Sequence, residues 1–383
     1  MGAIVGFLTM VRVLDAVDLG GFAQSLMMAL ATMVAVTASF LRGERFRINY
    51  WLLAFLGACA LSLIVMRPVP LGTCWMRFAG FVVGLAALSP LAVTPLLNEF
   101  RRGAWNGLFA ACVLITLTSF AMLCYAVATS STAEYHHFGF RGIMKLGMAL
   151  SPVAALSAIL SLHKMLTSGC SCGARAVAWA IVCVISVITA VAAGSRIAVA
   201  GLVCAAAILM VVAWRKGSRQ KVVLALSMMA AVGLVSVCVP AVRESVSMKN
   251  ALSVEAGSPF SSRIDRWTGR LAEFESAPLT GIGFSAQTVF NSEFDDPESV
   301  LAGSSTEPGS SWLSLLAHTG LIGTIAFIAF WGAVLKHSAK HPRPFLLAVL
   351  SFLVINGICE GWLLFSGALM FPFFWILTSI LND

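Results

Sequence analysis

Three arginines share one edge of a predicted helix between Ser261 and Phe284: Arg263, Arg266 and Arg270. Their i, i+3 and i+7 spacing puts them on one side of an α-helix. An apolar stripe runs beside them: Ile264, Trp267, Leu271 and Phe274. Guanidinium groups form paired hydrogen bonds with phosphate, so this edge can hold a lipid-linked anion where the membrane meets water. An interfacial helix that only anchors itself through lipid headgroups has the same pattern, and both interpretations stay open.

The bounds of this helix follow from the residues that flank it. Serines at 261 and 262 are good N-caps, so we expect the helix to begin at Arg263. Pro278 ends it, and Gly281 and Gly283 allow a tight turn.

Two further charged residues lie near predicted helix ends. Arg196 follows Gly194 and Ser195; it can extend to the membrane surface along its own aliphatic stem, which the pattern favours, or bind a phosphate. Glu360 is an ionisable group close to lipid and hence a functional candidate, although pairing with an arginine is favoured over catalysis. The acidic run 293–298 is interpreted as a hydrophilic turn rather than a metal site, because no histidine or second carboxylate cluster supports it.

The elements that must position these residues are membrane helices. The 383 residues are 59% hydrophobic and 11% charged, with a mean hydropathy of +0.91, which excludes an ordinary soluble domain. Apolar runs of about 20 residues, enough to cross a bilayer, recur along the chain and predict eleven spans: 21–41, 49–66, 75–97, 105–128, 144–163, 174–193, 197–214, 221–240, 312–335, 344–359 and 362–380. Residues 1–18 can add a twelfth, short helix. The predicted fold is an all-α polytopic membrane protein.

Basic residues in the short loops set the orientation. Fourteen fall on the face that carries Arg42 and five on the opposite face, and the more basic face is cytoplasmic. Residues 241–311 therefore form one large extracytoplasmic loop, between N-terminal helices in 1–240 and C-terminal helices in 312–383. The net charge of +8 reflects this topology, and it carries no nucleic-acid signal.

Three segments, taken in order, resemble the O-antigen ligase and polymerase superfamily, the Wzy-type membrane enzymes of bacterial surface glycan assembly. They are GSRIAVAGL (194–202), RWTGRLAEFESAPLTGIGF (266–284) and WLSLLAHTGLIG (312–323). Many members, ligases above all, place His-Asn before the last segment, where this chain has Gly309 and Ser310. Glu307 is the nearest proton acceptor, and His136 and His137 in the outer loop 129–142 are alternatives. His318 lies inside the predicted helix and is interpreted as structural.

The resemblance implies a GT-C-like, metal-independent glycosyltransferase without cofactors, in the bacterial inner membrane with its site facing the periplasm. Its donor and acceptor would be glycans on undecaprenyl diphosphate, with a chain-length regulator as a further partner. Arg196 and Arg266 would stabilise the leaving diphosphate and Glu307 would act as base. The expected substrate contacts are Arg263, Arg270, His136, His137, Arg141 and Glu360. The missing histidine favours a polymerase over a ligase, and a transporter or flippase is the alternative from another class.

Overall fold

The computed structural model describes residues 1–11, 14, 21–69, 71–129, 135–136, 139–144, 147–168, 173–238, 261–286, 309–340 and 342–383. Its N-terminal helices are α1 (Gly2–Val11), α2 (Gly21–Leu41), α3 (Tyr50–Met66), α4 (Leu71–Leu88) and α5 (Pro95–Ala128). The middle helices are α6 (Gly147–Thr167), α7 (Ala174–Ala192), α8 (Arg196–Arg215) and α9 (Arg219–Cys238). The last four are α11 (Ser261–Ser276), α13 (Ser311–Lys340), α14 (Pro344–Cys359) and α15 (Phe371–Leu381).

The predicted class is confirmed: this is an all-α, multi-pass membrane protein. Six helices within the described ranges are long and apolar enough to cross a bilayer, namely α4, α5, α6, α7, α8 and α13. Four shorter apolar helices accompany them: α1, α3, α14 and α15. Helix α1 corresponds to the short N-terminal helix that the sequence suggested.

Three predicted spans, 75–97, 105–128 and 362–380, differ from the observed helices by more than five residues at one end. The span predicted over 75–97 is divided, because α4 ends at Leu88 and α5 begins at Pro95. Proline at the first position of α5 and the Thr94 hydroxyl, which accepts a hydrogen bond from the Leu97 amide at 3.2 Å, start a new helix there. The span predicted over 362–380 is shorter, since α15 begins only at Phe371.

Two small antiparallel strand pairs connect the helices. Strand β1 (Arg47–Ile48) pairs with β2 (Ala92–Val93). Strand β3 (Tyr135–His136) pairs with β4 (Gly139–Phe140), so that His136 is opposite Gly139.

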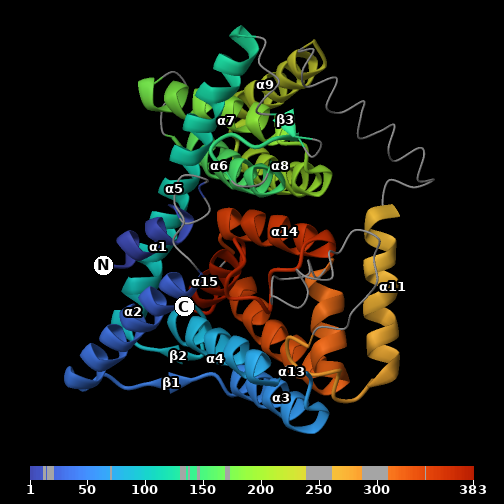
Figure 1. Ribbon diagram of the computed structural model, residues 1–383. Helices are drawn as coiled ribbons and strands as arrows, with labels where there is room; N and C mark the ends of the chain where they lie inside the picture. Colours follow the sequence, from blue (N-terminus) through green and yellow to red (C-terminus); the bar gives the residue numbers. More distant parts are fainter. Residues whose placement is uncertain are drawn as a thin grey trace.

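The helices form two groups that the 34-residue helix α5 joins (Figure 1). Helices α6 to α9 pack together in one group, and α1 to α4 lie with α13 and α15 in the other. Helix α14 packs along α8 and so links the groups. Helix α11 stands at one side of the molecule, beside α13.

Arg101, in α5, closes the corner between α4 and α5. Its side chain is fully buried, and its guanidinium makes five hydrogen bonds of 2.8–3.4 Å. The acceptors are the carbonyls of Ala86, Ala87 and Ala92, the Asn98 amide oxygen and the Ser379 hydroxyl. Because a guanidinium has five N–H donors, this arginine is saturated by the protein and its role is structural.

Candidate functional site

The arginine edge of α11 faces the protein. The side chains of Arg263 and Arg270 are only 12% and 11% exposed, whereas Ile264 and Leu271 are 41% and 43% exposed. The helix begins at Ser261, two residues before the predicted start, and packs on α13. In the headgroup-anchor interpretation the arginines would turn away from the protein. The observed orientation of the arginines therefore does not match the headgroup-anchor interpretation.

Each of two arginines on this edge meets a carboxylate. Arg263 Nη2 lies 3.2 Å from Glu360 Oε1, at the end of α14, so the predicted pairing of Glu360 with an arginine is confirmed. Arg270 Nη1 lies 2.6 Å from Glu273 Oε2 within α11. The side chain of Glu273 is 2% exposed, and a carboxylate that deep requires a charged or hydrogen-bonding partner.

Arg270 also contacts a buried histidine. Its Nη1 lies 3.3 Å from Nε2 of His318, a residue of α13 that is 1% exposed. An arginine only donates, so Nε2 is the acceptor in this hydrogen bond. His318 thus helps to orient Arg270 from inside the helix.

Arg266 packs against Gly309, just before α13. A Cβ atom added to Gly309 would lie 2.8 Å from Arg266 Cβ, closer than real contacts allow. Gly309 has a φ of 75°, which side-chain-bearing residues rarely adopt. Its carbonyl accepts a hydrogen bond from Trp267 Nε1 at 3.3 Å. The missing side chain at 309 is what lets α11 approach the start of α13 so closely.

Two serines fix the start of α13 to the end of α14. Ser311 Oγ donates to the Glu360 carbonyl at 2.7 Å and accepts from the Trp362 amide at 3.0 Å. Ser310 Oγ donates to the Gly357 carbonyl at 3.3 Å. Glu360 is therefore held by its backbone at the place where its side chain meets Arg263. We call the set formed by Arg263, Arg266, Arg270, Glu273, Gly309, His318 and Glu360 the α11 face.

Backbone hydrogen bonds between the turn 278–282 and residues 317–322 of α13 position the α11 face, and we call this contact the backbone clamp. The turn enters a break in α13 at Gly320, whose φ of 59° and ψ of −165° are non-helical. The amide of Ile282 donates to the Ala317 carbonyl at 2.9 Å, and the amides of Leu321 and Ile322 donate back to the turn at 2.9 and 3.2 Å.

The glycines of the clamp are required by space. A Cβ on Gly281 would lie 2.4 Å from the His318 carbonyl carbon, and one on Gly320 would lie 2.4 Å from the Leu279 carbonyl oxygen. The Pro-Leu-Thr-Gly-Ile-Gly motif is thus a docking device that carries α11 onto α13. Phe284 follows it and is buried against Phe78 and Phe81 of α4.

The other predicted site arginines, Arg196 and Arg141, lie at the turn between α7 and α8. Arg196 is the first residue of α8 and is exposed. A Cβ on Gly139 would lie 2.6 Å from the Ala193 carbonyl oxygen, so the β3–β4 hairpin, followed at once by Arg141, packs on this turn. Five residues beyond Arg196, Gly201 packs on Phe352 of α14, the helix that ends beside Glu360. Helix α14 thus connects the turn that carries Arg196 with the α11 face.

Two predicted site residues, Glu307 and His137, lie outside the described residues, and so does the acidic run 293–298, interpreted as a hydrophilic turn. Of His136, the backbone in β3 is described. Among the described residues, no three His, Cys, Asp or Glu side chains gather as metal ligands would.

Sequence reasoning missed one member of the α11 face. Glu273 is the buried partner of Arg270, and its i+3 spacing from that arginine was a readable signal, because residues so spaced are neighbours on a helix. The contact of His318 with Arg270 joins residues 48 positions apart and had no local signal.

The family model described as O-antigen ligase matches residues 181–328. The match contains Arg196, all of α11 and the break in α13 at Gly320, and it confirms the resemblance recognised from the motifs. No curated protein matches the chain.

Proposed function

We propose, from the premise that residues 181–328 belong to the O-antigen ligase family, that this membrane protein is a polysaccharide polymerase. It joins oligosaccharide repeat units carried on undecaprenyl diphosphate into exopolysaccharide, capsule or O-antigen. The family and the membrane helices support glycosyl transfer in glycan assembly as the general activity. Polymerisation, the polyprenyl carrier, the GT-C type, the independence from metal and the periplasmic side of the inner membrane are parts of the proposal.

The packing of Arg266 on Gly309 is the observation on which we prefer a polymerase to a ligase. Many members of the family that the chain resembles, ligases above all, have a histidine where this chain has Gly309. A side chain there would collide with Arg266 and strain a backbone whose φ is 75°. The chain therefore has no room for the ligase-type histidine, which favours a polymerase. Transfer of finished glycan to lipid A-core is the second candidate, and the family match supports it equally.

The proposed reaction uses the arginines as anion stabilisers. A hydroxyl of one glycan attacks the anomeric carbon of the other, a glycosidic bond forms, and the bond to undecaprenyl diphosphate breaks. Negative charge grows on the diphosphate as it leaves, and positioned cations lower the barrier where charge develops. Arg196 and Arg266 take this role, while Arg263, Arg270 and Arg141 contact phosphate or sugar. Glu307 takes the proton from the attacking hydroxyl.

The direct test is reconstitution with defined substrates. Purified protein in liposomes receives lipid-linked repeat units alone, or together with lipid A-core, and products are separated by length. We expect a ladder of lengthened chains with repeat units alone. A single transfer to lipid A-core, without lengthening, would instead establish the ligase. Transport of the intact lipid-linked unit without a new bond would place the protein in the transporter class.

Variants in the same assay test the roles. Arg266→Ala should lower turnover about 10²–10³-fold, as the loss of one transition-state donor does. Arg266→Lys should rescue poorly, because an ammonium lacks the planar fork. Arg42→Ala, an exposed arginine remote in sequence, is the control and should keep full activity. Full activity of Arg266→Ala and Arg196→Ala would remove both residues from the site.

The base is tested with three parallel variants. Glu307→Gln should keep donor binding and lower turnover sharply, whereas His136→Ala and His137→Ala should remain active. An active Glu307→Gln together with a dead histidine variant would move the base to the 129–142 loop.

A further inference from the structure

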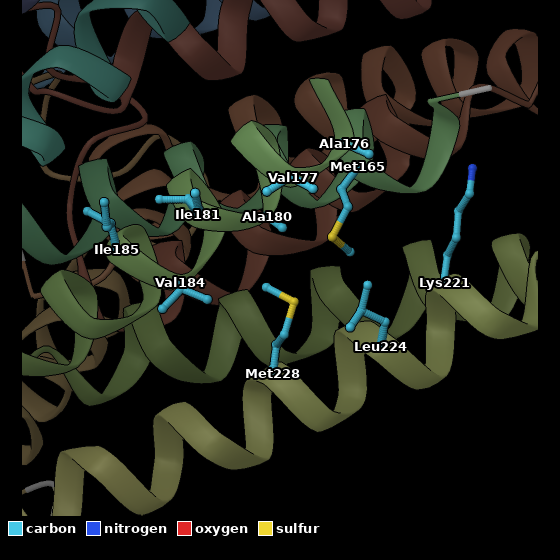
Figure 2. Close-up of a pocket in the computed structure, with 10 residues that line it drawn as sticks. All are labelled: Met165, Ala176, Val177, Ala180, Ile181, Val184, Ile185, Lys221, Leu224 and Met228. Carbon is cyan, nitrogen blue, oxygen red and sulfur yellow. The ribbon is translucent and has the colours of Figure 1, made fainter. Parts of the chain in front are cut away.

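An apolar groove runs between α6, α7 and α9, on the half of α7 away from Arg196. Its cavity volume is about 370 Å³. Val177, Ile181 and Val184 of α7 face Leu224 and Met228 of α9 across it (Figure 2). Val177 and Ile181 are 51% and 55% exposed and Leu224 is 46% exposed, so the groove opens to the surface of the helix bundle. In a membrane protein that surface faces lipid.

The length of the groove matches one leaflet. It extends along α7 from Ala176 to Ile185, about 14 Å at 1.5 Å per residue. Half of the hydrocarbon core of a bilayer measures about 15 Å. A chain lying in the groove would thus reach from the membrane surface to the middle of the bilayer.

One end of the groove is strongly basic. Lys221 lies at that end (Figure 2), where its ammonium donates to the carbonyls of Leu166, in the last turn of α6, and Ser168, just after that helix. Five more cations lie at the same ends of the four helices: Lys164, Arg175, Arg215, Lys216 and Arg219.

No carboxylate of this region balances these charges. Residues 135–243 contain no Asp or Glu at all, and none of the six cations forms an ion pair within the described part of the chain. Basic pockets between membrane helices on the cytoplasmic side bind anionic lipid headgroups, and each Lys or Arg near the membrane surface contributes about 1 kcal/mol of attraction. Topology alone explains basic loops, but it does not explain an apolar groove of leaflet length leading from them.

We propose that this groove is a binding site for an anionic phospholipid, with one acyl chain between α7 and α9 and the headgroup phosphate at Lys221. The site lies in the leaflet opposite the α11 face, and it is independent of the reaction proposed above. Its consequence is that helix α9, from which the chain leads into residues 241–311, is held to α6 and α7 through a bound lipid.

The test uses delipidated, purified protein and native mass spectrometry. Phosphatidylglycerol and phosphatidylcholine with identical acyl chains are added separately, and the tightly retained lipid is counted. We expect one phosphatidylglycerol to remain bound at least tenfold more tightly than phosphatidylcholine. Equal retention of the two lipids would overturn the proposal, because it would show that only acyl packing is involved.

Groove-filling variants locate the site. Ala180→Phe and Val177→Trp should each remove the retained phosphatidylglycerol, and Lys221→Gln should weaken its retention several-fold. Val203→Phe is the matched control: Val203 lies on α8, is 52% exposed and does not line the groove, so retention should match the unchanged protein. Retention that survives both filling variants would contradict the proposal, and so would displacement of the phospholipid by an equimolar amount of undecaprenyl phosphate.

Discussion

The Arg101 corner and the α11 face both hold arginine side chains against the helix bundle, Arg101 fully buried and those of the α11 face partly buried, but they hold them in different ways. Arg101 donates five hydrogen bonds to the protein, three of them to backbone carbonyls at the α4–α5 corner. Arg263 and Arg270 instead form ion pairs with carboxylates, those of Glu360 and Glu273, and Arg270 also donates to His318. At the corner the arginine fixes the backbone, whereas at the α11 face the backbone clamp at Gly320 fixes the helix that carries the arginines. A phosphate can compete with a carboxylate for a guanidinium, since both match the same fork, and this makes the α11 face suited to a ligand.

The largest effect is expected at the clamp. Gly320→Ala places a Cβ 2.4 Å from the Leu279 carbonyl oxygen in a backbone region that is essentially limited to glycine. Neither the backbone at Leu279 nor that at Gly320 can move aside at low energetic cost, so we expect the free energy of unfolding to fall by about 3 kcal/mol or more. Thermal unfolding in detergent should show a much lower midpoint.

Gly332→Ala in the same helix is the control for the clamp. No atom lies within 4 Å of a Cβ added there, and alanine should be neutral or stabilise α13 by about 0.5–1 kcal/mol. Equal unfolding midpoints for the two variants would show that the turn after α11 does not depend on the break in α13.

The second effect is expected at the Arg101 corner. Arg101→Leu leaves the carbonyls of Ala86, Ala87 and Ala92 without their donor, and each unpaired buried acceptor costs about 1–3 kcal/mol. Thermal unfolding should show a clear loss of stability, and the activity per folded molecule should stay unchanged. Arg102→Leu is the neighbouring control, because its side chain is 60% exposed in a pair with Asp383, and exposed pairs contribute about 1 kcal/mol or less. A stable but inactive Arg101→Leu protein would show that Arg101 serves the reaction and would contradict its structural role.

The smallest and most informative effect is expected at Glu360. Glu360→Gln removes the charge that Arg263 pairs with, while the Glu360 backbone stays held by Ser311. The unfolding midpoint should change little, because both side chains are partly exposed. Without the competing Glu360 charge, the Arg263 guanidinium should bind the donor phosphate more tightly, so we expect the KM for lipid-linked repeat units to fall by about fivefold, equivalent to about 1 kcal/mol. Arg263→Ala should raise the same KM, and a rise in both variants would show that the pair serves structure alone.

The sequence determined the membrane class, the helix that carries the arginines and the resemblance to the O-antigen ligase family over residues 181–328. Apolar runs of bilayer length and an i, i+3, i+7 arginine series are local patterns, and local patterns are readable because a helix repeats every 3.6 residues. The glycines after α11 were also visible as a turn. Helix ends were read less well around Pro90 to Pro95, where a new N-terminus interrupts a continuous apolar run.

Only the tertiary structure decided which way the arginines face and what they meet. An amphipathic pattern defines two sides of α11, but it does not say which side the bundle covers, because in a membrane protein the apolar side can face lipid. Arg263 meets Glu360 across 97 positions of the chain and Arg270 meets His318 across 48. Gly281 meets the backbone of His318 and Thr319 at the break in α13. Such contacts depend on how the helices pack, since neighbours in space leave no fixed spacing in the chain when they lie on separate helices.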